Sequence, residues 1–298
     1  MTTRTPFIVA GTAIAIAGLV LAGCTATTTT DDSSMTTDSS DSATSDSATT
    51  GVVSTADGLM LASWGDNVSV SFADGTIRFV SDGIPNHDRQ AEYAVPTAGV
   101  RVPDASTAVA APDPTVAQDY DFTITTNPVL AGEPTSTSLG TIGVMISGAA
   151  LFNPYEGDGA TVATASNFTV LNDAGQEVAF LDSCNGHPNP MGAYHYHGLP
   201  TCITAVVDEV GGPSHILGVA FDGFPIYGDR AMDGTQLTAD DLDECGGILS
   251  ATPEFPEGIY HYVLLDTADS TSSIRCFSGI VDESLTQTAA GGIGGMHP

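Results

Sequence analysis

Hydrophobic and polar residues alternate over two stretches that flank the pair Asp74-Gly75. Apolar residues stand at every second position on both sides of this pair, at Val68, Val70, Phe72, Ile77 and Phe79. Period-two alternation is typical of strands with one buried face, and an Asp-Gly pair between two such runs is the strongest short-range signal for a β-hairpin. We therefore predict a hairpin over residues 68–79.

The same alternation recurs further along the chain, at residues 120–124 and on both sides of a turn at residues 172–175. The 33 glycines and 17 prolines divide the sequence into short segments, and no long stretch shows the 3.6-residue period of a helix. One helix is predicted to begin at Thr238, whose spacing to Asp241 forms a capping box. The pattern predicts an all-β, sandwich-like domain with very little helix.

The chain is strongly acidic, with 36 acidic and 6 basic residues and a formal net charge of −30, and every basic residue is an arginine. Proteins bind nucleic acid and anionic membrane surfaces largely through Lys and Arg, so this charge argues against both as partners. The hydrophobic content of 42% is enough for a packed core. The acidity is spread over the folded part and resembles that of salt-adapted proteins.

The N-terminus has the pattern of an export signal. Arg4 precedes an apolar run over residues 7–22, which ends in Leu21-Ala22-Gly23-Cys24. The run is shorter than the roughly 20 apolar residues of a membrane span, and its ending resembles a lipoprotein lipobox. We predict a lipoprotein signal peptide over residues 1–23, lipidation of Cys24, and an exported protein anchored by lipid to the cell membrane or outer membrane. A plain signal peptide or a simple N-terminal anchor is the alternative.

Composition divides the rest of the chain into four segments. Residues 25–50 contain ten Thr, seven Ser and five Asp, a composition that cannot bury enough apolar surface to fold, so residues 24–55 are predicted to be a disordered tether. Residues 56–117 form an N-terminal β segment, residues 118–283 the main domain, and residues 284–298 a flexible Gly-rich tail.

Three short motifs occur twice in the main domain, in the same order. They are Gly143-Val144 and Gly218-Val219, Asp182-Ser-Cys184 and Asp243-Glu-Cys245, and Tyr194-His195-Tyr196 and Tyr260-His261-Tyr262. The two copies of each motif lie roughly 60–75 residues apart, which indicates an internal duplication into two related halves. The two Tyr-His-Tyr segments should then occupy equivalent strands, and the two aspartates, present in both halves, are expected to cap turns.

Four cysteines remain when Cys24 is set aside, and disulfides persist in exported proteins. Four cysteines permit three connectivities, and the repeat favours Cys184 with Cys202 and Cys245 with Cys276. The alternative is a thiolate metal site, but no C-x-x-C spacing is present.

Three of the seven histidines, His187, His195 and His197, fall within eleven residues. On a strand, His195 and His197 would project from one face about 6.6 Å apart and could share an ion, with either His187 or His261 of the second copy as a third ligand. Imidazole ligands suit zinc or copper. The alternatives are core histidines bonded to the backbone and acid–base catalysis. His87 and His215 have no such context and are expected to be surface or packing residues.

At these residues the sequence resembles the YHYH-domain family of exported proteins. The similarity covers roughly residues 118–282 and rests on Gly186-His187-Pro188, Tyr194-His195-Tyr196-His197-Gly198, the run from Gly218 to Gly228, Leu242-Asp243-Glu244-Cys245, Tyr260-His261-Tyr262 and Cys276-Phe277-Ser278-Gly279. The resemblance implies an exported domain and no particular reaction. In the second copy Val263 stands where the pattern has its last histidine.

Asp222 is a carboxylate that only one copy has, since its nearest counterpart in the first copy is Ser147. It is a candidate catalytic base or a partner that orients a histidine. The alternative is an Asp-Gly turn between strands.

These observations favour a membrane-tethered, extracytoplasmic domain that binds zinc or copper through His187, His195, His197 and His261. A metal-dependent or His/Asp hydrolase is the second hypothesis, although the H-E-x-x-H, G-x-S-x-G and Walker signatures are absent. A structural or interaction domain of the cell surface is the third, and the sequence identifies no protein partner.

Overall fold

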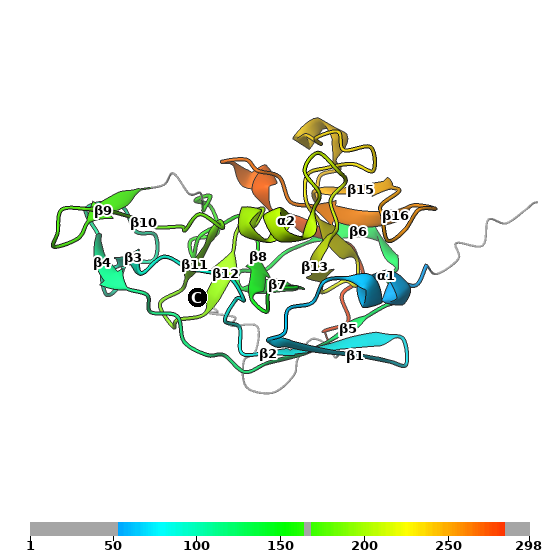
Figure 1. The fold of residues 1–298 in the computed structure, drawn as a ribbon, viewed down its shortest axis with the longest axis horizontal. Helices are drawn as coiled ribbons and strands as arrows, with labels where there is room; N and C mark the ends of the chain where they lie inside the picture. Colours follow the sequence, from blue (N-terminus) through cyan, green and yellow to red (C-terminus); the bar gives the residue numbers. More distant parts are fainter. Residues whose placement is uncertain (1–52, 164–167, 284–298) are drawn as a thin grey trace, which may run out of the picture. The chain divides into compact units, whose positions relative to one another are not determined.

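The computed structural model describes residues 53–163 and 168–283 (Figure 1). The predicted signal peptide, Cys24, the tether up to residue 52 and the tail over 284–298 lie outside the described residues. The described residues all lie in one compact unit. Residues 56–117 therefore belong to the same body as the main domain.

An eight-stranded sheet forms the centre of this unit, in the order β11-β12-β8-β7-β13-β14-β16-β15. Its first half consists of β11 (Gly186–Pro188), β12 (Tyr194–Tyr196), β8 (Ala150–Phe152) and β7 (Thr141–Met145). Its second half consists of β13 (Ile216–Ala220), β14 (Pro225–Tyr227), β16 (Ile259–Val263) and β15 (Gly247–Ser250). The strands that meet in the middle, β7 and β13, are buried almost throughout, so the core lies where the two halves join.

The strand directions read the same from either edge of this sheet. The edge strand is antiparallel to its neighbour, that neighbour is parallel to the third strand, and the third strand is antiparallel to the fourth. The strands β7 and β13 pair antiparallel at the centre. The two Tyr-His-Tyr segments therefore occupy equivalent strands, β12 and β16, each second from an edge. The duplication itself stays a prediction.

Smaller sheets complete the fold. They are β1-β2-β5 (Val68–Ala73, Thr76–Ser81, Tyr120–Thr125), β3-β4 (Glu92–Pro96, Ala108–Pro112), β9-β10 (Thr169–Leu171, Glu177–Ala179) and β6-β17 (Leu130–Ser136, Cys276–Gly279). The predicted hairpin is confirmed, because β1 and β2 pair around Asp74 and Gly75, both of which have positive φ. The all-β, sandwich-like fold class is confirmed as well.

The helices differ from the prediction. The segment after Thr238 forms one 3-10 turn, η1 (Ala239–Asp241), with the predicted capping box in place. The α-helices lie elsewhere, at α1 (Ala56–Leu61) and α2 (Thr201–Val207), and a second 3-10 turn, η2, spans Ser270–Ser272. Six or seven residues are too few to establish a helical period in the sequence. In the described part of the chain, no helix has the length and apolar character needed to cross a membrane.

Candidate functional site

Three of the four predicted ligands meet at the edge of the sheet's first half. His187 in β11 pairs directly with His195 in β12, and His197 follows two residues later, so that all three rings gather at one place. Each histidine is less than one-tenth exposed. One ring nitrogen from each lies within 4.8 Å of the other two. The fold therefore assembles a buried group of three imidazoles, called here the histidine triad.

The hydrogen bonds of two rings fix which nitrogen carries the proton. The Nδ1 atom of His195 lies 3.0 Å from the carbonyl of Ala193, and that of His197 lies 2.7 Å from the carbonyl of Asn153. A carbonyl oxygen only accepts, so each Nδ1 must donate and each Nε2 of a neutral ring carries a lone pair. These two Nε2 atoms face each other at 2.9 Å. The buried Nε2 of His187 has no hydrogen-bond partner among the described residues.

Burial keeps the triad neutral. Loss of hydration lowers the pKa of His197 to about 4, although its hydrogen bond to Asn153 acts in the opposite direction. The pKa values of His187 and His195 are lowered well below their usual range, first by burial and then by the neighbouring imidazoles. Near neutral pH all three rings are therefore in the form that binds metal ions.

Aromatic rings hold two of the histidines in place. Phe152 stacks on His195 with ring centres 3.9 Å apart, and Phe180 lies 4.3 Å from the ring of His187. Beside His197 there is a cavity of only about 10 Å³, lined in part by Leu181, Leu199 and Leu265. Such a cavity has room for about one water molecule.

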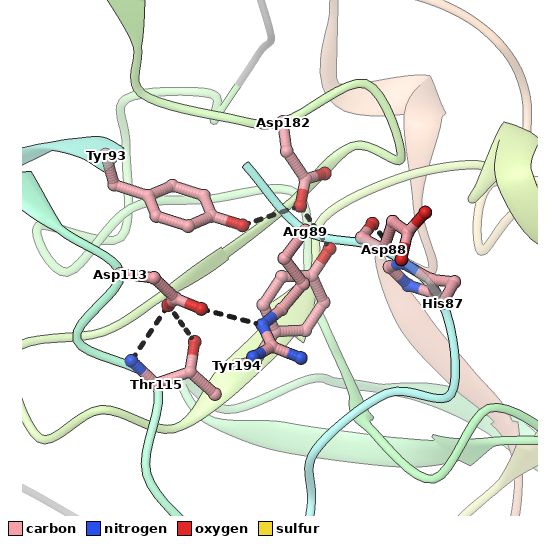
Figure 2. A network of polar contacts seen from close by, with 8 residues as sticks. All are labelled: His87, Asp88, Arg89, Tyr93, Asp113, Thr115, Asp182 and Tyr194. Atoms are coloured by element: carbon pink, nitrogen blue, oxygen red, sulfur yellow. Dashed lines mark hydrogen bonds and ion pairs between the residues drawn. The ribbon is translucent and has the colours of Figure 1, made fainter. Parts of the chain in front are cut away.

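The first tyrosine of β12, Tyr194, belongs to a different network. The hydroxyl of Tyr194 and that of Tyr93 each donate to Asp182 at 2.8 Å, as Figure 2 shows beside the ion pair of Arg89 with Asp113. The other oxygen of Asp182 accepts from the backbone amides of Cys184 and Gly186. Asp182 thus caps the turn before β11, as predicted from its presence in both halves.

Asp243 repeats this arrangement in the second half. It accepts from the amides of Cys245 and Gly247 and from the hydroxyl of Tyr260.

His261 does not join the triad. It lies in β16, five strand spacings from β12, which corresponds to roughly 24 Å at about 4.8 Å per strand. Ile248 pairs with His261 where His187 pairs with His195. The alternative in which His261 is the third ligand beside His195 and His197 is therefore not met in this structure, because the halves join through β7 and β13 and leave β12 and β16 on opposite sides.

Asp222 is fully buried in the turn between β13 and β14, and burial raises its pKa to about 6. It accepts from the hydroxyl of Tyr262 at 2.5 Å and from the amide of Gly279 at 2.9 Å. Among residues 53–163 and 168–283 no histidine bonds to it, so the predicted histidine-orienting role is not seen there. Its full burial favours the turn over a catalytic base.

Both predicted disulfides are confirmed, Cys184–Cys202 and Cys245–Cys276. The first closes a loop that contains the whole histidine triad. Sequence reasoning gave His87 no role, yet its Nε2 lies 2.6 Å from the hydroxyl of Tyr196. This contact spans 109 residues of sequence, and no local pattern signals it.

One comparison with known proteins gives a match. The family model described as "YHYH protein" matches residues 121–240 and 231–279, together just over half of the chain. No curated protein and no solved structure matches the sequence.

Proposed function

This chain belongs to the YHYH protein family, and we propose that it binds one transition-metal ion, zinc or copper, through His187, His195 and His197. The histidine triad supplies three neutral imidazoles within reach of a single ion. Nitrogen donors of this kind suit zinc and copper better than calcium or magnesium, which prefer oxygen.

One observation carries the proposal, the facing Nε2 atoms of His195 and His197 at 2.9 Å. Both Nδ1 protons are committed to backbone carbonyls, so the two lone pairs repel each other unless a cation lies between them. A proton could serve, but burial lowers the pKa of both rings and disfavours it. The Nε2 atom of His187 lies next to them and has no hydrogen-bond partner among the described residues. A bound cation would give this buried atom a partner as well.

The carbonyls of Ala193 and Asn153 would orient the His195 and His197 rings toward a bound ion. Metal-binding histidines almost always donate their second ring N–H to a carbonyl or carboxylate, which fixes the tautomer and the ring plane. Both carbonyls already hold the two Nδ1 protons in this way. The site is therefore organised for an ion by the fold itself.

Binding is favoured over hydrolysis by the space beside the triad. A bound ion could activate a water molecule, but the adjoining cavity of about 10 Å³ is far smaller than the roughly 300–1,000 Å³ of typical ligand pockets. An organic substrate does not fit there without rearrangement.

The domain is further proposed to act outside the cytoplasm on a lipid anchor at Cys24. The lipobox-like sequence Leu21-Ala22-Gly23-Cys24 supports the anchor. Two disulfides support an oxidising compartment, since the cytosol keeps thiols reduced.

The test is a calorimetric titration of chelator-treated protein with zinc and with copper. We expect one ion per chain in the natural protein and none in a His195→Ala/His197→Ala variant. A His215→Ala variant is the matched control and should bind as the natural protein does. Weak, substoichiometric uptake by the natural protein, or equal uptake by the double variant, would contradict the proposal.

A further inference from the structure

A histidine lies beside one of the two disulfides and not beside the other. A ring nitrogen of His87 and the sulfur atoms of Cys184 and Cys202 lie within 4.8 Å of one another. His87 belongs to the segment between β2 and β3, about a hundred residues before the cysteines, so the fold brings the imidazole there. Within residues 53–163 and 168–283, no histidine or carboxylate forms such a group with Cys245 and Cys276.

The two disulfides otherwise have the same exposure pattern. Cys184 and Cys245 are buried, while Cys202 and Cys276 are each partly exposed. The more exposed residue of each bridge is therefore its second cysteine, Cys202 or Cys276. The imidazole is one chemical difference between the two bridges; a second is that Cys202 lies in the first turn of α2, whereas Cys276 is the first residue of β17.

The hydrogen bonds of His87 let its ring gain a proton without losing a partner. Nδ1 donates to the carbonyl of Asp88 at 2.9 Å, and Nε2 lies 2.6 Å from the hydroxyl of Tyr196, which lies 2.9 Å from that of Ser147. A hydroxyl can donate or accept. Neutral His87 accepts from Tyr196; protonated His87 donates to Tyr196, which then donates to Ser147.

We propose that Cys184, Cys202 and His87 form a thiol–disulfide exchange site that reacts with a dithiol. A thiolate of the dithiol attacks the sulfur of Cys202, the partly exposed residue of the bridge, the S–S bond breaks, and the sulfur of Cys184 leaves as a thiolate. Protonated His87 stabilises this thiolate through its positive charge, and the thiolate takes up the proton that the attacking thiol of the dithiol has released. The second thiolate of the dithiol then displaces Cys202, which takes up the other proton, and two electrons have passed from the dithiol to the cystine.

This chemistry accounts for the position of His87. A disulfide opens faster when the departing thiolate is stabilised, and an adjacent imidazolium is a common way to stabilise one. The loop that opens is the one that contains the histidine triad. The exchange site nevertheless does not depend on the metal proposal, because the reaction can be followed in metal-free protein.

The experiment measures the opening of each bridge in chelator-treated, folded protein. Dithiothreitol is added at pH 7, free thiols are trapped with iodoacetamide at intervals, and peptide mass spectrometry reports each cysteine pair separately. We expect Cys184–Cys202 to open about tenfold faster than Cys245–Cys276, and a His87→Gln variant to slow only the first bridge, again on the order of tenfold.

A His215→Gln variant is the control and should leave both rates unchanged. Equal rates for Cys184–Cys202 in the natural protein and in His87→Gln would overturn the proposal. A parallel change at both bridges in His87→Gln would overturn it too, since it would show a general loss of stability. The ratio of the two rates in the natural protein is a second test that needs no variant, and a ratio near one contradicts the proposal.

Discussion

The two halves of the central sheet share a frame and differ in the chemistry that the frame carries. In both, an aspartate caps the turn before the edge strand and accepts from the first tyrosine of the Tyr-His-Tyr segment. In both, the central histidine donates Nδ1–H to a carbonyl two residues before it. The first half surrounds His195 with two more histidines, whereas the second surrounds His261 with Ile248 and Val263.

The second tyrosine of each Tyr-His-Tyr segment also has a similar position and a different bonding partner in the two halves. Tyr196 bonds to the hydroxyl of Ser147, and Tyr262 donates to the carboxylate of Asp222. Ser147 and Asp222 are the nearest counterparts in the predicted repeat, and the two halves give this tyrosine different polar partners. The frame therefore tolerates different polar groups, and the position of a histidine in this frame does not by itself make it a ligand.

The largest effect that we expect separates the two central histidines. His195→Ala should weaken zinc or copper binding by more than a thousandfold, about 4 kcal/mol, because it removes one of the three proposed ligands, and even outer-shell changes typically lower affinity about 10- to 100-fold. His261→Ala should leave the dissociation constant unchanged. Competition with a chelating dye measures both, and equal losses in the two variants would show that the halves are not chemically distinct.

The disulfides give the next largest effect. Loop closure predicts that replacing Cys245 and Cys276 by Ser lowers the free energy of unfolding by about 4 kcal/mol, and that replacing Cys184 and Cys202 lowers it by about 3 kcal/mol, because the loops span 31 and 18 residues. Urea denaturation of metal-free protein measures both values. Only the second replacement should also weaken metal binding, and unaltered binding there would mean that the loop does not hold the triad.

Asp222, in the second half, should make the free energy of unfolding depend on pH. Burial raises its pKa to about 6 in the folded protein, against about 3.9 in an unfolded chain. Between these two pKa values the folded state keeps a proton that the unfolded chain releases. The contribution of protonated Asp222 to the free energy of unfolding is therefore fully present below about pH 4 and is lost as the pH rises through about 6. The loss is up to about 3 kcal/mol.

An Asp222→Asn variant lacks this titration. Its free energy of unfolding, relative to the natural protein, should rise by up to about 3 kcal/mol between pH 4 and 7. Denaturation of metal-free protein at several pH values measures the difference, and a difference that does not vary with pH would refute the prediction.

The smallest effects compare the two second tyrosines. Tyr262→Phe leaves the Asp222 carboxylate and the amide of Ser278 without their hydroxyl partner, and should lower the free energy of unfolding by about 2 kcal/mol. Tyr196→Phe removes bonds to the Ser147 hydroxyl and to the His87 ring, neither of which is a carboxylate, and should lower it by about 1 kcal/mol. Thermal unfolding of both variants tests the order, and the reverse order would contradict the account of the two halves.

Local patterns predicted the parts of this molecule that depend on neighbouring residues. The Asp74-Gly75 hairpin follows from backbone preferences and alternation, and the spacing of His195 and His197 places both rings on one side of a strand. The position of His187 beside His195 and His197 was predicted, because a short connection joins β11 to β12. Both disulfides followed from the repeat.

The remaining features depend on contacts between distant segments. Nothing local shows that β7 and β13 join the halves, and this pairing is what separates His261 from His195. The approach of His87 to Tyr196 and to the Cys184–Cys202 bridge depends on the path of a different segment. The short helices α1 and α2 lack enough residues to show a period.

The most direct test of the central claim is anomalous diffraction from crystals soaked with zinc or copper. The account predicts one strong peak per chain, lying among the Nε2 atoms of His195 and His197 and the ring of His187, with no peak at His261. A peak at His261, or no peak at the triad under conditions in which the soaked metal is detected elsewhere in the crystal, would contradict it.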